Sequence, residues 1–249
     1  MKNILELADS DTVFLETRKA SDFQFNQEVA HVFDDMVSRS VPYYEEMQRM
    51  TVELVGDFAR DGTNIYDVGC STGTTLALID AQIGATKSTL VGIDNSNEML
   101  AKAEQKLKKI GLAHPLQLEC KDIQQDMKIE NASVVTMLLT LQFVRPLYRE
   151  KIMQTIANGI NSGGCLLMIE KITSRDTTFN RLFIDHYYAF KRRNGYSDME
   201  IAQKREALEN ILIPYRLEEN IDLLKGAGFG TVEVFFRWYN FCGIVAMKH

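Results

Sequence analysis

The 249-residue sequence contains few of the residues that build disulfide frameworks or zinc sites. Its four cysteines are Cys70, Cys120, Cys165 and Cys242, and none of them forms a C-x-x-C pair. None of the four histidines lies at metal-ligand spacing from a cysteine. Because disulfides belong to oxidising compartments and zinc sites need clustered ligands, we predict no metal and a reducing, cytoplasmic location.

Basic charge and long apolar runs are also scarce. The 28 Lys and Arg residues are outnumbered by 34 Asp and Glu residues, so a broad nucleic-acid-binding surface is not expected. Two short basic runs, at residues 191–193 and 204–205, are interpreted as solvated helix faces. No apolar run approaches the ~18 residues of a membrane span, and acids occupy the N-terminus where a signal peptide is apolar. We therefore predict no membrane partner and no direct nucleic-acid contact.

The spacing of apolar residues divides the chain into segments. Residues 1–24 are polar with scattered apolar positions and are predicted to be an N-terminal tail. Residues 25–60 repeat apolar residues at helical spacing, broken at Pro42, and predict a helical cover. Five short apolar strands then alternate with helices, which predicts a parallel sheet with right-handed crossovers. These strands are expected at residues 64–68, 90–94, 115–119, 134–139 and 165–169.

The last third of the chain departs from this alternation. Residues 175–215 are rich in aromatic residues and helical in pattern, and we predict a helical insertion over the strand ends. Two further runs, 231–238 and 241–248, are joined by Tyr239 and Asn240 and predict a hairpin. The expected fold is α/β and Rossmann-like, in one domain over residues 25–249. Its sheet has seven mostly parallel strands and ends in an antiparallel hairpin.

A glycine-rich turn follows the first predicted strand, in the sequence Asp67-Val-Gly-Cys-Ser-Thr-Gly. Glycine suits such a turn because a ligand approaches the backbone closely and φ can be positive. A dinucleotide-binding fingerprint would have glycine where Ser71 stands. Asp67 would also lie badly beside a pyrophosphate, whereas its carboxylate suits a ligand that carries an ammonium group. The alternative is an ordinary strand-to-helix turn without a ligand.

Two more acids follow the next two predicted strands. Asp94 ends the second strand, where a carboxylate can accept both ribose hydroxyls of a nucleoside; alone, it could equally be an acid at a helix N-terminus. Asp122 follows the third strand and can accept from an adenine amino group, with Ile123 against the ring; alone, it could be a turn aspartate. Together with Asp67, these acids meet at the carboxyl edge of the sheet and predict a nucleoside site.

These motifs resemble those of class I S-adenosylmethionine-dependent methyltransferases, and other segments narrow the resemblance to the carboxy-S-adenosyl-L-methionine synthases. The similarity runs from about Phe25 to Ala246 and is carried by residues 39–44, 66–71, 93–96, 129–133, 140–143, 190–197, 203–205 and 208–210. It implies the class I methyltransferase fold and a site for S-adenosylmethionine or its carboxylated form. The implied ligand-binding residues are Tyr44, Asp67, Gly69, Cys70, Ser71, Asp94, Asn95, Asp122, Ile123 and Leu138.

The resemblance also implies the reaction. Members of this family move a carboxyl group from prephenate onto the sulfonium methyl of S-adenosylmethionine, leaving phenylpyruvate. Their product serves a partner enzyme that carboxymethylates a wobble uridine of tRNA. By resemblance, Arg205 is the catalytic residue that holds the new carboxylate, since guanidinium pairs with carboxylate in a planar, bidentate way; the alternative is a surface arginine. Family members also suggest a homodimer, consistent with exposed aromatic surface on the insertion.

One position departs from the family. The family has an asparagine at the end of the fourth strand, where Leu138 stands. The backbone carbonyl there can still accept from the ligand's ammonium group, but the side-chain amide is gone. Two readings follow: the pocket keeps the carboxylation activity, or the chain performs conventional methyl transfer to a small molecule or tRNA. A third hypothesis is a binding module without chemistry. No general base is evident, which is compatible with proton removal by the substrate itself.

Overall fold

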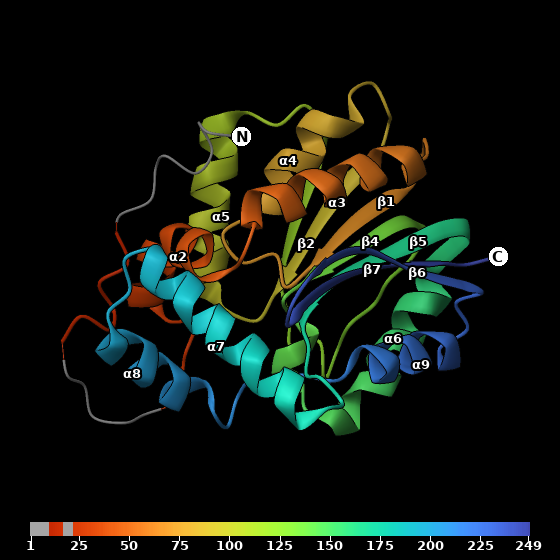
Figure 1. Cartoon of the computed structure of the whole chain (residues 1–249). Coiled ribbons are helices and arrows are strands. Elements are labelled where there is room, and N and C mark those ends of the chain that lie inside the picture. The colour runs from red at the N-terminus through yellow and green to blue at the C-terminus, as the bar shows by residue number, and fades with distance from the viewer. Residues whose placement is uncertain (1–9, 17–21) are drawn as a thin grey trace.

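The computed structural model describes residues 10–16 and 22–249, and one seven-stranded sheet lies at its centre (Figure 1). The strands are β1 (Asn64–Val68), β2 (Thr89–Asp94), β3 (Leu116–Cys120), β4 (Ala132–Leu138), β5 (Ile160–Lys171), β6 (Thr231–Trp238) and β7 (Phe241–Met247). Their order is β3-β2-β1-β4-β5-β7-β6. Strands β1 to β5 pair in parallel, and β7 is antiparallel to both of its neighbours. The predicted fold class is confirmed.

Helices cover both faces of this sheet (Figure 1). Their bounds are α2 (Gln27–Ser40), α3 (Tyr44–Phe58), α4 (Thr74–Ile83), α5 (Asn97–Ile110), α6 (Pro146–Gly159), α7 (Thr177–Arg193), α8 (Asp198–Leu208) and α9 (Leu217–Gly226), with a 3-10 turn η1 (Leu141–Phe143). Successive strand residues point to opposite faces. Ile65 accordingly packs with α3, α4 and α5, whereas Tyr66 packs with α6 and α9. Strands buried on both faces read as the continuous apolar runs seen in the sequence.

Helices α2, α7 and α8 lie together at the carboxyl end of the central strands (Figure 1). The hydroxyl of Tyr187 on α7 donates to the carbonyl of Ser40 at the end of α2, at 3.0 Å. The side chain of Asn194 donates to the carbonyl of Arg39, also at 3.0 Å. These contacts tie residues of the segment predicted as an insertion to the segment predicted as a cover. Together they close the sheet edge where ligands bind in open α/β folds.

Part of the predicted N-terminal tail is packed against these helices, while residues 1–9 and 17–21 lie outside the described residues. Val13, Phe14 and Phe23 are buried in a cluster with α2 and with Ala207 of α8. The hydroxyl of Tyr196 donates to the carboxylate of Asp11 at 2.6 Å. The scattered apolar residues of this segment therefore form part of the apolar core shared by α2 and α8.

The fifth strand is longer than the sequence predicts. The predicted strand covers residues 165–169, whereas β5 runs from Ile160 to Lys171. Its register against β4 shifts between Ala132 and Val134, which accommodates the glycines of this segment as an irregular start. Within the described residues, no helix is both long enough and apolar enough to cross a membrane.

Candidate functional site

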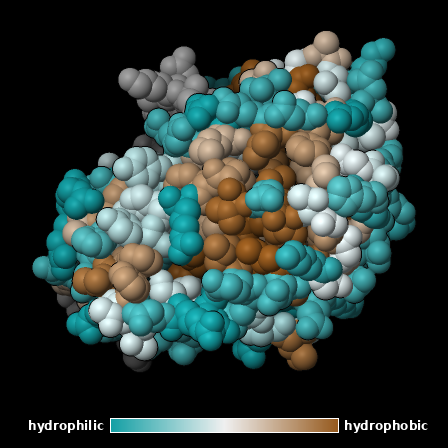
Figure 2. Space-filling model, turned by 45° about the vertical axis from the view of Figure 1, so that its right-hand side comes forward, coloured by the Kyte–Doolittle hydropathy of each residue, from teal (hydrophilic) through white to brown (hydrophobic). Residues whose placement is uncertain are grey.

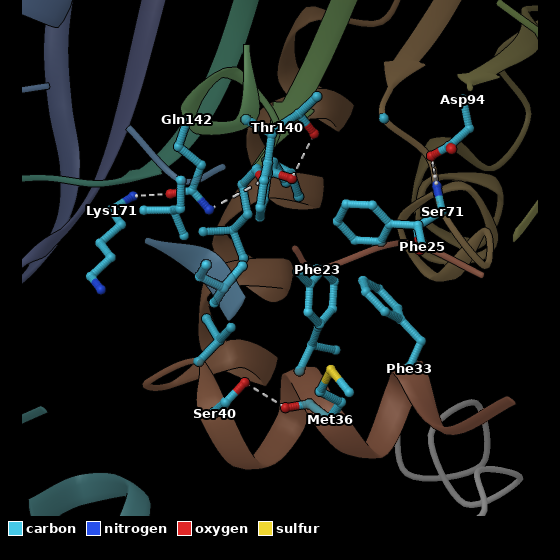
Figure 3. A pocket seen from close by; sticks show the side chains of 18 of the residues that line it. Phe23, Phe25, Phe33, Met36, Ser40, Ser71, Asp94, Thr140, Gln142 and Lys171 are labelled. Atoms are coloured by element: carbon cyan, nitrogen blue, oxygen red, sulfur yellow. Dashed lines mark hydrogen bonds between the residues drawn. The ribbon is translucent and has the colours of Figure 1, made fainter. Parts of the chain in front are cut away.

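A cavity of about 430 Å³ opens at the carboxyl ends of β1, β2 and β4, beneath α2, α7 and α8. Figure 3 looks into it, with the rings of Phe23, Phe25 and Phe33 on one wall and Lys171 and Asp94 on opposite sides. The structure brings together all of the predicted site residues except Asp67. Those that line the cavity are Tyr44, Gly69, Cys70, Ser71, Asp94, Asn95, Asp122, Ile123, Leu138 and Arg205.

The glycine turn is held in a conformation that few other residues tolerate. Gly69 has φ +78°, and a Cβ atom there would lie 2.2 Å from Oγ1 of Thr140. The amides of Gly69 and Cys70 both donate to the carbonyl of Ile93, which fixes the turn against β2. Ser71 has φ +48° although it is not glycine, a strain that clusters at ligand sites. The turn therefore presents its backbone to the cavity in one fixed shape.

Asp94 sits beside this turn at the end of β2. Its two carboxylate oxygens accept from the backbone N–H groups of Ser71 and Ser96, each at 2.9 Å (Figure 3). Burial raises the pKa of Asp94, and these bonds oppose the shift. Each carboxylate oxygen can accept a second hydrogen bond, so the group can still bind two ligand hydroxyls. The contact of Asp94 with a ribose remains a prediction, and the two remaining acceptor positions of the carboxylate are compatible with it.

Asp122 lies at the rim of the same end of the cavity. Its Oδ1 accepts from the N–H of Gln124 at 3.0 Å, and its Oδ2 accepts from Nε2 of Gln125 at 2.8 Å. The neighbouring Ile123 is half-buried and packs against the core beneath α6. The carboxylate is thus held by its own turn next to an apolar surface, which is compatible with the predicted adenine contact.

Asp67 lies beneath the glycine turn rather than in the cavity wall. The side chain is buried, and its Oδ1 accepts from Oγ1 of Thr136 at 2.7 Å. Its Oδ2 has no hydrogen-bond partner among the described residues. Burial raises the pKa of Asp67 to about 7. The predicted contact with a ligand ammonium group is untested, and Oδ2 is the atom that would accept it.

Tyr44 and Leu138 form part of the wall between the turn and the helical cover. The hydroxyl of Tyr44 accepts from Nε2 of Gln48 at 3.0 Å, and burial raises its pKa. Oε1 of Gln48 is buried without a partner among the described residues. The carbonyl of Leu138 accepts from Oγ1 of Thr140 at 3.0 Å and keeps a second lone pair. Leu138 therefore places an aliphatic side chain where the family has an asparagine amide. Its backbone carbonyl can still accept a hydrogen bond from a ligand.

A buried glutamate, not predicted from the sequence, shapes the same wall. The carboxylate of Glu170 accepts from the N–H groups of Leu141 and Gln142 at 2.9 and 2.8 Å, and burial raises its pKa to about 8. The side chain of Gln142 accepts from the N–H of Lys171 at 2.9 Å (Figure 3). These bonds hold the turn after β4 rigidly against β5.

Three lysines line the cavity, with Lys171 on the side opposite Asp94 (Figure 3), and sequence reasoning missed their role. Lys171 ends β5, while Lys191 and Lys204 come from α7 and α8. The interpretation of both basic runs as solvated faces is wrong for two of their members, because Lys191 and Lys204 are only 5% and 6% exposed. Helical spacing was the missed signal: Lys191 lies four residues after Tyr187 and shares its inward face.

Lys191 and Lys204 are buried and Lys171 is half-buried, and none of the three has an acidic partner in contact among the described residues. Desolvation lowers the pKa of Lys171 and of Lys204 to about 8. It also lowers that of Lys191, which the other two lysines depress further. The ammonium groups of Lys171 and Lys191 lie 4.8 and 4.7 Å from the ring centre of Tyr187. Arg205 stands at the exposed rim beside them and forms no ion pair with a described residue.

Comparisons with known proteins agree with this geometry. A family model described as a methyltransferase domain matches residues 65–164. A carboxy-S-adenosyl-L-methionine synthase from Methylococcus capsulatus is 55% identical over 227 residues, covering 91% of this chain and 94% of the relative. Another from Helicobacter pylori (strain Shi470) is 44% identical over 242 residues, covering 96% and 99%.

Solved structures show the same fold. A methyltransferase from Aquifex aeolicus, described as dependent on S-adenosylmethionine, matches with a TM-score of 0.58 at 17% sequence identity. The match covers 91% of this chain and all of that one (100%), so it concerns the whole fold. Within the described parts of the chain, no group of three or more His, Cys, Asp or Glu side chains is placed to hold a metal ion.

Proposed function

The chain belongs to the carboxy-S-adenosyl-L-methionine synthase family, and from this premise we propose that it converts S-adenosylmethionine and prephenate to carboxy-S-adenosylmethionine and phenylpyruvate. One observation carries the proposal. A single cavity has acids at one end, suited to a nucleoside, and an excess of cations at the other, suited to carboxylates. The product would supply a second enzyme that modifies a tRNA wobble uridine.

The residues fit the nucleoside part of S-adenosylmethionine. The turn at Gly69 leaves no room for a side chain, so a ligand can approach the backbone. Asp94 would accept from the ribose hydroxyls, and Asp122 would accept from the adenine amino group above Ile123. The unpartnered oxygens of Asp67 and Gln48 suit the ammonium group of the amino acid part.

The substrates supply most of the chemistry. S-adenosylmethionine brings a methyl carbon acidified by its sulfonium, and prephenate loses CO2 and hydroxide as its ring becomes aromatic. The hydroxide and one methyl proton make water, and the carbon of CO2 bonds to the methyl carbon. No histidine lines the described cavity, in keeping with a proton acceptor that comes from the substrate.

The protein's part in this reaction is to position and to exclude water. Phe25, Phe33 and Phe143 form an aromatic wall. The ring centre of Phe25 lies 6.2 Å from that of Phe33 and 5.4 Å from that of Phe143. Such a wall keeps water from the released CO2 and strengthens nearby electrostatic contacts. Arg205 would bind the new carboxylate in bidentate fashion. Positioning of this kind supplies much of an enzyme's rate.

Conventional methyl transfer is the second candidate, and Leu138 is the observation that favours it. Loss of the family's amide removes one polar contact from the sulfonium side of the cavity. A chain that bound S-adenosylmethionine without placing it for carboxylation would instead transfer the methyl group to an acceptor. Its product would be S-adenosylhomocysteine, which separates the two candidates chemically.

The experiment uses the purified protein with prephenate labelled with ¹³C at the ring carboxyl group. We expect phenylpyruvate and a carboxy-S-adenosylmethionine heavier by one mass unit, both identified by mass spectrometry. Small molecules released by denaturing the freshly purified protein should include the same carboxylated compound. Absence of phenylpyruvate, with S-adenosylhomocysteine formed once an acceptor is supplied, would overturn the proposal in favour of methyl transfer.

The proposal includes a cytoplasmic homodimer. Apolar side chains gather in a hollow on one face of the molecule, ringed by polar ones (Figure 2). Phe179 and Leu182 on α7 and Tyr239 in the β6–β7 turn are 56%, 45% and 39% exposed. Exposed apolar surface of this kind commonly marks an interface. Sedimentation equilibrium should give twice the monomer mass, and a single-chain mass would contradict the dimer.

A further inference from the structure

The described cavity holds more positive charge than S-adenosylmethionine alone explains. Lys171, Lys191, Lys204 and Arg205 all line it, and they come from three successive elements: β5, α7 and α8. Lys191 lies close enough to Lys171 and Lys204 for both to repel its charge. Nζ of Lys204 is buried and has no hydrogen-bond partner among the described residues. A buried ammonium group without a partner is costly unless something else supplies an anion.

No carboxylate of a described residue forms an ion pair with these lysines. Asp11 is the acid that most favours the charged forms of Lys191 and Lys204. Its carboxylate is already engaged, because Oδ2 accepts from the hydroxyl of Tyr196 at 2.6 Å and Oδ1 accepts from the N–H of Val13 at 3.2 Å. It forms no ion pair within 4 Å of either lysine in the described structure. The charge is therefore available to a ligand.

The number of cations indicates which ligand. S-adenosylmethionine carries one carboxylate, on the amino acid part that Tyr44 and Gln48 are placed to face from α3. Carboxylation adds a second carboxylate, which Arg205 suits. Three further cations on other elements remain, and the donor is the only other reactant. Prephenate carries two carboxylates, of which only one is transferred.

Resting on the proposed function, we infer that Lys171, Lys191 and Lys204 form a subsite for the carboxylate that the donor keeps. The subsite would select dicarboxylate donors over monocarboxylates. It would hold the donor by its side-chain carboxylate while the other carboxyl group points toward the sulfonium end. Lys171 lies on the side of the cavity opposite Asp94, so a donor bound there leaves the nucleoside site free (Figure 3).

The test replaces each lysine by methionine, which keeps the stem and removes the charge. Loss of a charge-assisted hydrogen bond should raise the KM for prephenate roughly 10- to 100-fold in Lys191→Met and Lys204→Met. The Kd for S-adenosylmethionine, measured by calorimetry, should stay within about twofold. Arg193→Met is the matched control: it lies on the exposed face of α7 and should leave both constants unchanged.

A stability measurement distinguishes a ligand subsite from a structural role. Because each lysine is buried and unpaired, Lys191→Met and Lys204→Met should raise the melting temperature of the ligand-free protein. A structural role predicts a lower melting temperature instead. Lys191→Arg keeps the charge and should recover part of the prephenate KM even if a methionine variant folds poorly.

The proposal is overturned if S-adenosylmethionine affinity falls in parallel with prephenate affinity, since the lysines would then bind the amino acid carboxylate. It is equally overturned if prephenate KM does not change. Failure of the proposed function is a separate result, because the wild-type protein would then produce no phenylpyruvate. In that case the subsite is tested by calorimetry with phenylpyruvate, which retains the side-chain carboxylate and should bind the wild-type protein at least about tenfold more tightly than Lys204→Met.

Discussion

The two ends of the cavity are built in opposite ways. At the nucleoside end, Asp94 accepts from two backbone N–H groups and the glycine turn is bonded to β2 before any ligand arrives. At the basic end, Lys191 and Lys204 are buried, and no described residue places an anion in contact with them. The first end is complete as the protein folds, whereas the second becomes electrostatically satisfied only when an anion binds. We infer from this difference that S-adenosylmethionine binds a preformed site, whereas the donor neutralises the basic end when it binds.

The largest expected effect falls at the preformed end. Gly69→Ala would bring a Cβ atom within 2.2 Å of Oγ1 of Thr140, at φ +78°. The positive φ costs about 1–2 kcal/mol and overpacking about 1–3 kcal/mol more, so we expect a strongly destabilised protein that no longer binds S-adenosylmethionine. Thermal unfolding and calorimetry measure both.

Gly62→Ala is the control for this prediction. Gly62 has φ +72° but no neighbour within 4 Å of an added Cβ, so it tests the backbone cost alone. We expect it to lose about 1 kcal/mol of stability and to keep its affinity for S-adenosylmethionine. Equal effects at the two glycines would show that the contact with Thr140 does not shape the site.

The next largest effect should differ between two ligands, carboxy-S-adenosylmethionine and S-adenosylmethionine. Arg205→Ala should weaken carboxy-S-adenosylmethionine binding roughly 10- to 100-fold, because a charge-assisted pair to the new carboxylate is lost. Plain S-adenosylmethionine lacks that carboxylate and should lose little. Calorimetry with both ligands gives the comparison, and Arg205→Lys should recover part of the difference, since lysine keeps the charge but not the fork. Equal losses for both ligands would remove the role assigned to Arg205.

The pH dependence should also separate the two ends. Lys171 and Lys204 have pKa values of about 8 in the ligand-free protein, against an ordinary value of 10.5. An anion binds their protonated forms, so prephenate KM should rise above pH 8, by about tenfold per pH unit for each lysine that must take up a proton. Asp11, Arg39 and Glu200 also act on Lys204, the acids favouring its charge and Arg39 opposing it.

The nucleoside end should respond in the other direction. Asp67 has a pKa raised to about 7, and a ligand ammonium group favours its ionised form. The affinity for S-adenosylmethionine should therefore rise as the pH increases through 7. Calorimetry across pH 6 to 9 measures this rise in affinity for S-adenosylmethionine. The binding of prephenate, followed by its KM, should instead weaken as the pH increases. If the binding of both ligands changed with pH in the same direction, the same groups would govern both.

Protein stability provides an independent check on the same lysines. Their pKa values are lowered in the folded state, so the unfolded chain binds more protons between about pH 8 and pH 10.5. The free energy of unfolding of the ligand-free protein should consequently increase over that window. The increase should be smaller in Lys204→Met, as followed by urea unfolding at each pH.

The same contrast explains what could be predicted from the sequence. The nucleoside end is encoded locally: Asp67 and Asp94 lie at the ends of their strands, the turn from Gly69 to Gly73 and Asp122 follow theirs, and parallel strands align those positions. The basic end is assembled from β5, α7 and α8, and its lysines look like surface charge when each run is considered alone. The folded arrangement shows that Lys191 and Lys204 face inward while Arg193 faces solvent. For Lys191 alone, its spacing from Tyr187 carries the same signal in the sequence.

The rest of the fold shows the same contrast between features encoded locally and features that depend on long-range contacts. The parallel arrangement of the central strands could be predicted from their alternation with helices, because the apolar runs of β1, β2 and β4 are buried on both faces. The role of the Glu170 carboxylate could not be predicted, because it depends on the N–H groups of Leu141 and Gln142 in another turn. The packing of Val13 and Phe14 against α2 likewise depends on where α8 comes to lie. Long-range contacts of this kind leave no periodic trace in the sequence.

The smallest expected effect is at Leu138, the position where this chain departs from its family. The carbonyl of Leu138 remains at the cavity wall and keeps a lone pair besides the bond from Thr140. If that carbonyl suffices to orient the substrate, Leu138→Asn should change the carboxylation kcat/KM by no more than about threefold, because a neutral hydrogen bond contributes little net free energy. Initial rates of phenylpyruvate formation measure the change, with Leu138→Met as the matched apolar control. An increase far above this range in Leu138→Asn alone would show that the aliphatic side chain had suppressed carboxylation, and would favour methyl transfer as the activity of the natural chain.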